Sequence, residues 1–195
     1  MRVTTFVVIT TLAMSNAYAA STYEGNGQVP PQFVLSGKAA ERLHDHISIN
    51  LETAEKLVAA CQAIARKTNS SAAIVVLDAQ GLPVLESRMD GAGLVQMRAT
   101  EQKTLTALRT RAPSHVLTNR NVQDPFTSQN MAVYGLTTNK GGLPIIVNGQ
   151  LIGAMGAGGM GTANAEENCV RDALEQVIGP QPPLLPDLPA RAANP

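Results

Sequence analysis

The stretch from residue 141 to residue 178 constrains the fold most, because two short apolar runs, a glycine cluster and a helical pattern follow one another there. The dipeptide Asn148-Gly149 separates the apolar runs 143–147 and 151–155. A type I′ turn needs a positive φ at both central residues, and Asn-Gly is favoured for that reason. The stretch therefore predicts a β-hairpin that leads into a helix.

Glycines connect this hairpin to the helix: Gly156, Gly158, Gly159 and Gly161. A strand that passes through glycines into a helix N-terminus exposes several backbone N–H groups at one place, and such a place can hold a carboxylate or phosphate. The alternative is that the glycines serve only close packing of a helix on the sheet. The sequence leaves both interpretations open.

The helix after the glycines has Asn164 as a candidate N-cap, and Glu166 and Glu167 lie in its first turn, where the helix dipole favours acids. The glycine spacing matches the GxGxxG pattern. A dinucleotide site, however, needs a second strand after the helix, with an acid about 20 residues on. Gly179-Pro180 and a proline-rich stretch follow instead, which argues against a dinucleotide site.

The composition fits a single globular domain with an aliphatic core. The chain has 195 residues, with 15 basic and 15 acidic side chains, and 44% of its residues are hydrophobic but only 3% aromatic. There is neither a basic excess nor a set of aromatic side chains for stacking bases, so the composition predicts no nucleic-acid partner.

The N-terminus has the three parts of a secretory signal peptide. Arg2 is the positive start, residues 6–14 form the apolar centre, and residues 17–19 read Ala-Tyr-Ala, an A-x-A cleavage site. The apolar run is too short and too rich in threonine for a membrane anchor. We expect residues 1–19 to be removed and the protein to be periplasmic or secreted, with no integral membrane segment after cleavage.

Two cysteines, Cys61 and Cys169, lie on the apolar faces of predicted helices. We expect two buried free thiols. The alternative is a disulfide, which export would permit and which needs the two Cα atoms within about 7 Å of each other. Neither cysteine has the CxxC spacing of a zinc or redox motif.

Three regions follow the signal peptide. Residues 20–49 form an arm punctuated by glycine and proline, with a short helix expected over 37–46. Residues 50–179 form the folded domain. Residues 180–195 are rich in proline and predict an extended tail, which we expect to lie on a neighbouring subunit.

Within the domain, apolar spacing of three and four residues predicts helices over 51–67, capped by Asn50 or Ser48, and over 94–110. Two strands are expected between them, over 72–77 and 82–88, with the hairpin described above near the end of the domain. Residues 119–138 predict an irregular loop in which 131–136 is a candidate strand. Hairpins with helices packed on one sheet indicate an α+β fold.

Five blocks, in order and at matching spacing, resemble the GlcG/HbpS-like family, which includes the C-terminal domain of PduO-type proteins and carries a haem-degrading domain name. They read VVLDAQG (75–81), SRMDGA (87–92), KTLTA (103–107), GGLPI (141–145) and GQLIGAMG (149–156). The family usually has Val-Ser after the first glycine of its glycine-rich stretch. This chain has Ala157-Gly158, which removes a hydroxyl.

The resemblance implies a profilin-like α+β domain with an antiparallel sheet of about five strands flanked by helices. It also implies a homo-oligomer, commonly an octamer, and haem binding. For exported members it implies an accessory role in haem handling or in haem or redox sensing.

Haem needs an axial ligand, and His44 and His46 on the arm are the leading candidates by the same resemblance. The alternative is that they are exposed polar residues. A thiolate of Cys61 is another candidate ligand. We expect His115, just after Pro113, to be a surface residue near a helix start.

Other polar residues are candidates for contacts with haem or with a small carboxylate ligand. Lys103 and Thr106 share a helix face, and the glycines Gly156, Gly158 and Gly159 add backbone N–H groups. Arg88 and Asp90 end a predicted strand and form either a part of this patch or a local turn pair. Finally, Glu166 and Glu167 are candidate metal ligands together with His44 and His46, with helix N-terminal acids as the alternative.

We therefore expect an exported, oligomeric haem-binding protein. A first alternative is an enzyme or binding protein for a small organic acid, which would use the glycine-rich loop with Lys103 and Arg88. A second alternative is a non-catalytic assembly partner. No Ser-His-Asp arrangement is evident, and catalytic groups need not be adjacent in sequence.

Overall fold

The computed structural model describes residues 47–189. His44 and His46, the predicted helix over 37–46 and the signal peptide lie outside the described residues. Five helices and four strands are present within them, in this order: α1 (Leu51–Lys67), β1 (Ala73–Asp78), β2 (Pro83–Arg88), α2 (Leu94–Thr110), α3 (Thr118–Gln123), α4 (Pro125–Val133), β3 (Gly142–Val147), β4 (Gln150–Gly158) and α5 (Ala163–Val177).

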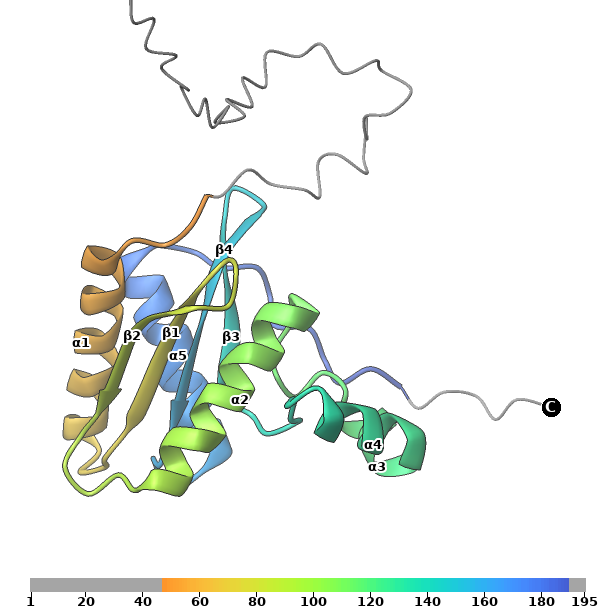
Figure 1. Cartoon of the computed structure of the whole chain (residues 1–195). Helices are drawn as coiled ribbons and strands as arrows, with labels where there is room; N and C mark the ends of the chain where they lie inside the picture. Colours follow the sequence, from red (N-terminus) through yellow and green to blue (C-terminus); the bar gives the residue numbers. More distant parts are fainter. Residues whose placement is uncertain (1–46, 190–195) are drawn as a thin grey trace, which may run out of the picture. The chain divides into compact units, whose positions relative to one another are not determined.

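The strands form one antiparallel sheet in the order β2-β1-β4-β3, with α1 and α5 on one face and α2 on the other (Figure 1). The expected α+β fold is confirmed, with four strands rather than about five among residues 47–189. The type I′ turn is also confirmed, because Asn148 has φ 51° and Gly149 has φ 78°. The central strand β1 is buried along nearly its whole length, as its unbroken apolar run predicted.

The larger part of the core lies between the sheet and the pair α1 and α5. Cys61 on α1 and Cys169 on α5 form a disulfide there, with their Cα atoms 5.3 Å apart. The prediction of two free thiols was therefore wrong, because the apolar faces of the two helices pack against each other and bring the cysteines within bridging reach.

Glycines let α2 approach the other face of the sheet. A Cβ added at Gly142 would lie 2.2 Å from the backbone oxygen of Lys103, and one added at Gly156 would lie 2.1 Å from Oγ1 of Thr104. Side chains at these positions would push the helix away. Gly156 therefore serves the close packing of α2 on the sheet, which was one of the two interpretations of the glycines.

Residues 119–138 are largely helical, so the expected irregular loop and the candidate strand over 131–136 were wrong. Asp124 begins α4 as its N-cap, with a side-chain oxygen that accepts the Phe126 N–H at 3.0 Å, and Pro125 follows at the first helical position. Both are standard helix-start signals. The structure thus uses Asp124-Pro125 to begin a helix.

The caps of the longer helices agree in part with the sequence. Asn50 caps α1, because its side chain accepts the Thr53 N–H at 2.9 Å, whereas Ser48 accepts the N–H of Ala79. Thr162, not Asn164, caps α5. Thr162 lies directly before the first helical residue, which is the position where a side-chain acceptor reaches the free N–H groups.

The described part of the tail, residues 179–189, has no regular secondary structure and is bonded to its own domain. Leu188 N–H donates to the carbonyl of Val116 at 2.8 Å, and Ile146 N–H donates to the Gln181 side chain at 3.2 Å. These contacts attach the described part of the tail to its own domain, and an additional contact with a neighbouring subunit stays a prediction. Among residues 47–189, no helix is long and apolar enough to cross a membrane.

Candidate functional site

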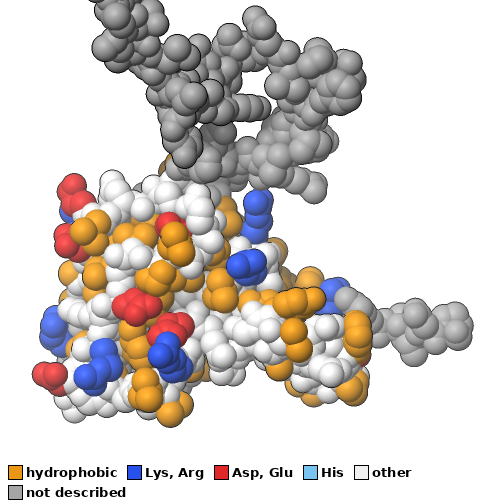
Figure 2. Space-filling view, viewed as in Figure 1, with side chains coloured by type: hydrophobic (Ala, Val, Ile, Leu, Met, Phe, Trp, Pro, Cys, Tyr) orange, Lys and Arg blue, Asp and Glu red, His pale blue; other side chains and the backbone are white. Residues whose placement is uncertain are grey.

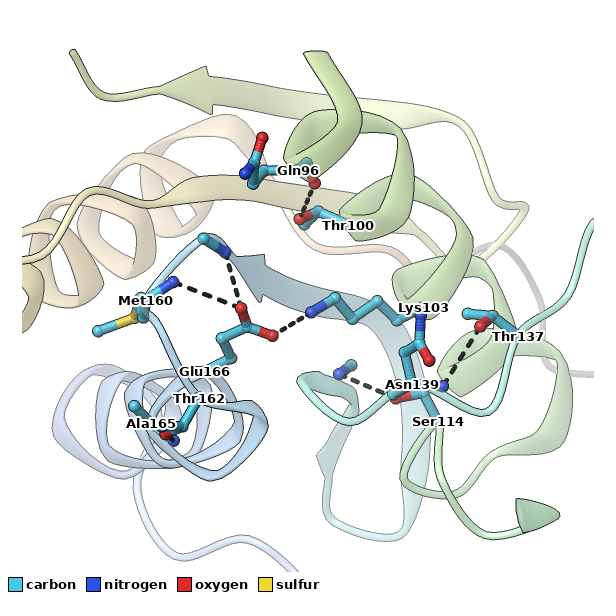
Figure 3. A network of polar contacts seen from close by, with 12 residues as sticks. Gln96, Thr100, Lys103, Ser114, Thr137, Asn139, Met160, Thr162, Ala165 and Glu166 are labelled. Atoms are coloured by element: carbon cyan, nitrogen blue, oxygen red, sulfur yellow. Dashed lines mark hydrogen bonds and ion pairs between the residues drawn. The ribbon is translucent and has the colours of Figure 1, made fainter. Parts of the chain in front are cut away.

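A buried ion pair joins α2 to α5 at the end of β4 where the glycines lie. Nζ of Lys103 is 2.5 Å from Oε2 of Glu166, and only 4% of the lysine side chain is exposed (Figure 3). Gly141 makes room for the ammonium, because a Cβ there would lie 3.0 Å from Nζ. The lysine therefore reaches a carboxylate that is 63 residues away in the sequence.

The second oxygen of Glu166 binds the backbone of the glycine-rich turn. Oε1 accepts the N–H of Gly159 at 2.7 Å and that of Met160 at 3.3 Å. Gly159 has φ +93°, a conformation that side chains other than glycine rarely adopt. The N–H groups at this turn thus hold an anionic group that belongs to the protein itself.

Burial lowers the pKa of Lys103 below its usual value, and the hydrogen bond and charge of Glu166 oppose that shift. Desolvation penalises the ammonium, while the nearby carboxylate favours it. The carboxylate of Glu166 therefore stabilises the Lys103 ammonium at a buried position that disfavours a charge. The same carboxylate binds the turn at Gly159 and Met160, so the ion pair fixes the geometry of that turn.

His115 lies beside this pair, between two carboxylates. Its Nδ1 is 2.5 Å from Oδ1 of Asp187 in the tail, and its Nε2 is 3.1 Å from Oε2 of Glu167 on α5. The second contact does not meet the angular requirement of a hydrogen bond, so both of its atoms remain without a hydrogen-bond partner. Only 8% of the His115 side chain is exposed, so the prediction of a surface residue was wrong.

The reason for this error is the distance between partners along the chain. Asp187 follows His115 by 72 residues and comes from the tail, which the sequence predicted only as an extended segment. Ser114 also anchors the region, because its hydroxyl donates to the Asn139 carbonyl at 2.5 Å. No local spacing in the sequence identifies either His115 or Asp187 as part of a site.

These groups border a cavity of about 480 Å³, here called the glycine-end pocket. Its walls include Val95, Ala99, Lys140 and the turn at Gly158 and Gly159. Lys140 donates to the Asn164 side chain at 3.3 Å and, within residues 47–189, has no carboxylate partner within ion-pair distance. The pocket wall therefore includes a cation, Lys140, that no carboxylate of the described residues neutralises.

Several predicted site residues lie elsewhere. Thr106 is buried and accepts the Thr137 N–H at 2.9 Å, and it is not among the pocket walls. Arg88 donates to the carbonyl of Ala92 at 2.7 Å, a local contact at the end of β2. Arg88 therefore does not join Lys103. The disulfide also removes Cys61 as a thiolate ligand.

No group of three or more His, Cys, Asp or Glu side chains that could hold a metal occurs among residues 47–189. Both oxygens of Glu166 are already bound, and Glu167 is buried facing His115. The carboxylates of Glu166 and Glu167, predicted as candidate metal ligands, thus contact other residues of the protein in the described part of the chain.

A second cavity, of about 290 Å³, lies near the start of β4 and is here called the arm-end hollow. Its apolar walls come from Ile49, Val147, Ile152, Val177 and Ile178. Ile49 enters the fold there, with an N–H that donates to the Ile152 carbonyl at 2.9 Å. Residues 152 and 158 of β4 separate the two cavities by about 20 Å, at about 3.4 Å per strand residue.

Three comparisons with known proteins agree on the relationship. An uncharacterised 15.0 kDa protein of Citrobacter freundii, from the dhaT–dhaS intergenic region, is 32% identical over 136 residues, which cover 66% of this chain and 91% of the relative. A double mutant of Streptomyces reticuli HbpS matches with a TM-score of 0.63 and 26% identity, over 75% of this chain and 95% of that one. A crystal structure of a PduOC:haem complex matches with a TM-score of 0.62 and 21% identity, over 68% of this chain and 96% of that one, which concerns the fold alone.

The family model described as haem degrading protein HbpS-like matches residues 49–175. This match covers α1 to nearly the end of α5, including the Lys103–Glu166 pair and the hairpin. It ends before the tail that carries Asp187. The chain therefore belongs to the HbpS-like family.

Proposed function

We propose that this protein binds haem, with His44 or His46 of the arm as the axial ligand. The observation that carries the proposal is the match of residues 49–175 to a family described as haem degrading protein HbpS-like. When bound, haem iron supplies redox or ligand-binding chemistry that depends on its axial ligand and on the polarity around it.

The contacts of the described residues support an arm ligand. Cys61 is in a disulfide, and each ring nitrogen of His115 faces a carboxylate. His115 is the only histidine within residues 47–189. These contacts therefore favour a histidine ligand from the arm.

The arm-end hollow supports this location. His46 precedes Ile49 by three residues, so chain length keeps its Cα within about 11 Å of that of Ile49. The aliphatic walls of the hollow suit the apolar faces of a macrocycle, and Ile47 and Leu51 add exposed apolar side chains nearby. Its volume lies just under the usual range for small-molecule sites, about 300 to 1,000 Å³, so a second surface would complete the site.

We also propose that the protein is exported and forms a homo-oligomer, such as an octamer. The signal-like N-terminus and the Cys61–Cys169 disulfide support an oxidising compartment. Exposed apolar side chains gather on the α3–α4 lobe, as Figure 2 shows, and such patches commonly mark interfaces. They are Val122, Phe126, Val133 and Tyr134.

A haem titration followed by absorbance tests the main proposal. The chain from Ala20 to Pro195 should bind haem saturably, a His44→Ala/His46→Ala double variant should lose that binding, and a His115→Gln variant should keep it. Retained binding in the double variant with loss in His115→Gln would overturn the arm assignment. An absence of saturable binding in the unmodified chain would overturn the haem proposal.

A second candidate function is the binding or conversion of a small organic acid in the glycine-end pocket. The specific observation that favours it is Lys140, a cation that has no carboxylate partner among residues 47–189 and lines the same pocket as His115, which already contacts the carboxylate of Asp187. Arg88 takes no part in this version. Stabilisation of the protein by acetate or propionate tests it, since a ligand at a hundredfold excess over its Kd contributes about 2.7 kcal/mol.

A further inference from the structure

The tail segment 181–189 lies outside the family match, and it contributes one residue, Asp187, to the wall of the glycine-end pocket. Leu188 N–H donates to the Val116 carbonyl at 2.8 Å, and Nε of Arg120 donates to the Pro189 carbonyl at 3.1 Å. Asp187 sits next to these anchors and is itself a wall residue of the pocket. The tail therefore places a carboxylate at the pocket by means of backbone contacts on its C-terminal side.

The carboxylate of Asp187 occupies a position where an acid is favoured. Oδ1 of Asp187 lies 2.5 Å from Nδ1 of His115, which is within hydrogen-bond distance. The His115 side chain is fully enclosed apart from 8% of its surface, whereas 35% of the Asp187 side chain is exposed. His115 is thus a buried residue of the pocket wall, and Asp187 contacts it from the solvent-exposed side.

Removing Asp187 would leave a set of groups suited to another carboxylate. Glu166 already neutralises Lys103, and Lys140 has no acidic partner in the described part of the chain. His115 would keep its Nδ1 directed at the vacated position, while Glu167 faces the other ring nitrogen. A short monocarboxylate could accept from His115 and lie near the Lys140 ammonium.

We propose that Asp187 is a tethered competitor, which a small monocarboxylate must displace from His115 in order to bind. This inference rests on the second candidate function, that the glycine-end pocket holds a small acid. A group on the same chain competes intramolecularly, at an effective concentration that is in the millimolar range for short linkers, so monocarboxylates that bind weakly are excluded until the tail is released. Binding of the monocarboxylate to His115 therefore requires release of Asp187 and of the tail that carries it.

The first test compares acetate and propionate binding by calorimetry in the unmodified chain, in Asp187→Ala, and in Asp187→Ala/His115→Gln. We expect Asp187→Ala to bind about tenfold more tightly than the unmodified chain, consistent with loss of a millimolar competitor, and the double variant to lose the gain. Asp172→Ala is the matched control, because Asp172 is an exposed acid on α5 that pairs with Arg171 outside this pocket.

A second readout needs no variant that risks misfolding. If the acid displaces the tail, saturating propionate should speed hydrogen exchange of the Leu188 amide in the unmodified chain. Equal affinity of the unmodified chain and Asp187→Ala, with unchanged Leu188 exchange, would overturn the competitor role and leave the acid site intact. Failure of both proteins to bind either acid would overturn the acid site as well.

Discussion

The two ends of β4 differ in the kind of side chain that surrounds them. At the glycine end, ionisable side chains are paired: Lys103 with Glu166, both largely buried, and the buried His115 with the partly exposed Asp187. At the arm end, the chain enters the domain beside the arm-end hollow, whose aliphatic walls include Ile49, Val147 and Ile152. Buried charges must be satisfied within the chain, so the glycine end offers few free groups, whereas an apolar surface gains most from an added partner.

The two ends therefore contribute differently: the ion pair at the glycine end fixes local geometry, whereas the arm end offers surface for a binding partner. A buried ion pair contributes little net stability compared with well-packed apolar residues, but it is costly to break. The Lys103–Glu166 pair also orders the turn at Gly159 and Met160, which borders the glycine-end pocket. The pocket at the glycine end is thus pre-organised by contacts within the protein, whereas the site at the arm end is completed by its binding partner.

The disulfide connects the helices that begin at these two ends, since α1 starts at the arm end and α5 at the glycine end. It closes a loop of 108 residues. Removing it with Cys61→Ala/Cys169→Ala should lower the free energy of unfolding by roughly 4 to 5 kcal/mol in urea titrations, on the loop-entropy model. Reductant should destabilise the unmodified chain and leave the double variant unaffected, and equal stability of the two under oxidising conditions would contradict this expectation.

Breaking the ion pair tests the glycine end directly. Lys103→Met leaves a buried carboxylate without its cation and should cost about 3 to 5 kcal/mol of unfolding free energy. Lys56→Met is the control, because Lys56 pairs with Glu52 on the surface of α1 with 61% of its side chain exposed, and it should cost under about 1 kcal/mol. Similar losses in the two variants would mean that the Lys103 pair is not a buried one.

Close packing of α2 on the sheet should tolerate no added methyl group. Gly142→Ala would place a Cβ 2.2 Å from the Lys103 carbonyl oxygen and should cost about 1 to 3 kcal/mol by overpacking. Gly161→Ala meets no atom within 4 Å, so only its φ of +82° opposes the change, and we expect about 1 kcal/mol. Thermal denaturation of both variants would show the difference, and an equal cost would remove packing as the reason for Gly142.

The smallest expected effect is a pH dependence at the glycine end. Because burial lowers the pKa of Lys103, the unfolded chain binds more protons than the folded chain between the folded pKa and 10.5. The free energy of unfolding of the unmodified chain should therefore rise relative to that of Lys103→Met as pH increases through this alkaline window. Urea titrations at several pH values measure the difference, and a constant difference would show that Lys103 titrates normally.

The sequence predicted the regular elements of the fold well. The helices over 51–67 and 94–110, the two hairpins and the type I′ turn all depend on local patterns: apolar spacing and Asn148-Gly149. The region 119–138 was misread because its many polar residues hid the start signal at Asp124-Pro125.

The site was harder to predict, because its contacts join distant parts of the chain. Lys103 was named as a site residue, but its partner Glu166 could be identified only once α2 and α5 were placed on opposite faces of the sheet. His115 and Asp187 carry no motif, and their contact depends on the path of the tail. The disulfide likewise required the packing of α1 against α5.

Methyl NMR during a haem titration tests the central claim, that haem binds at the arm end and not at the glycine end. Ile and Val labelling reports on both ends, through Ile49, Ile152 and Val177 at the arm-end hollow and through Val95 at the glycine-end pocket. We predict that haem shifts or broadens the first three methyl signals and leaves the Val95 signal unchanged. Perturbation of Val95 with unchanged signals from Ile49 and Ile152 would contradict the account.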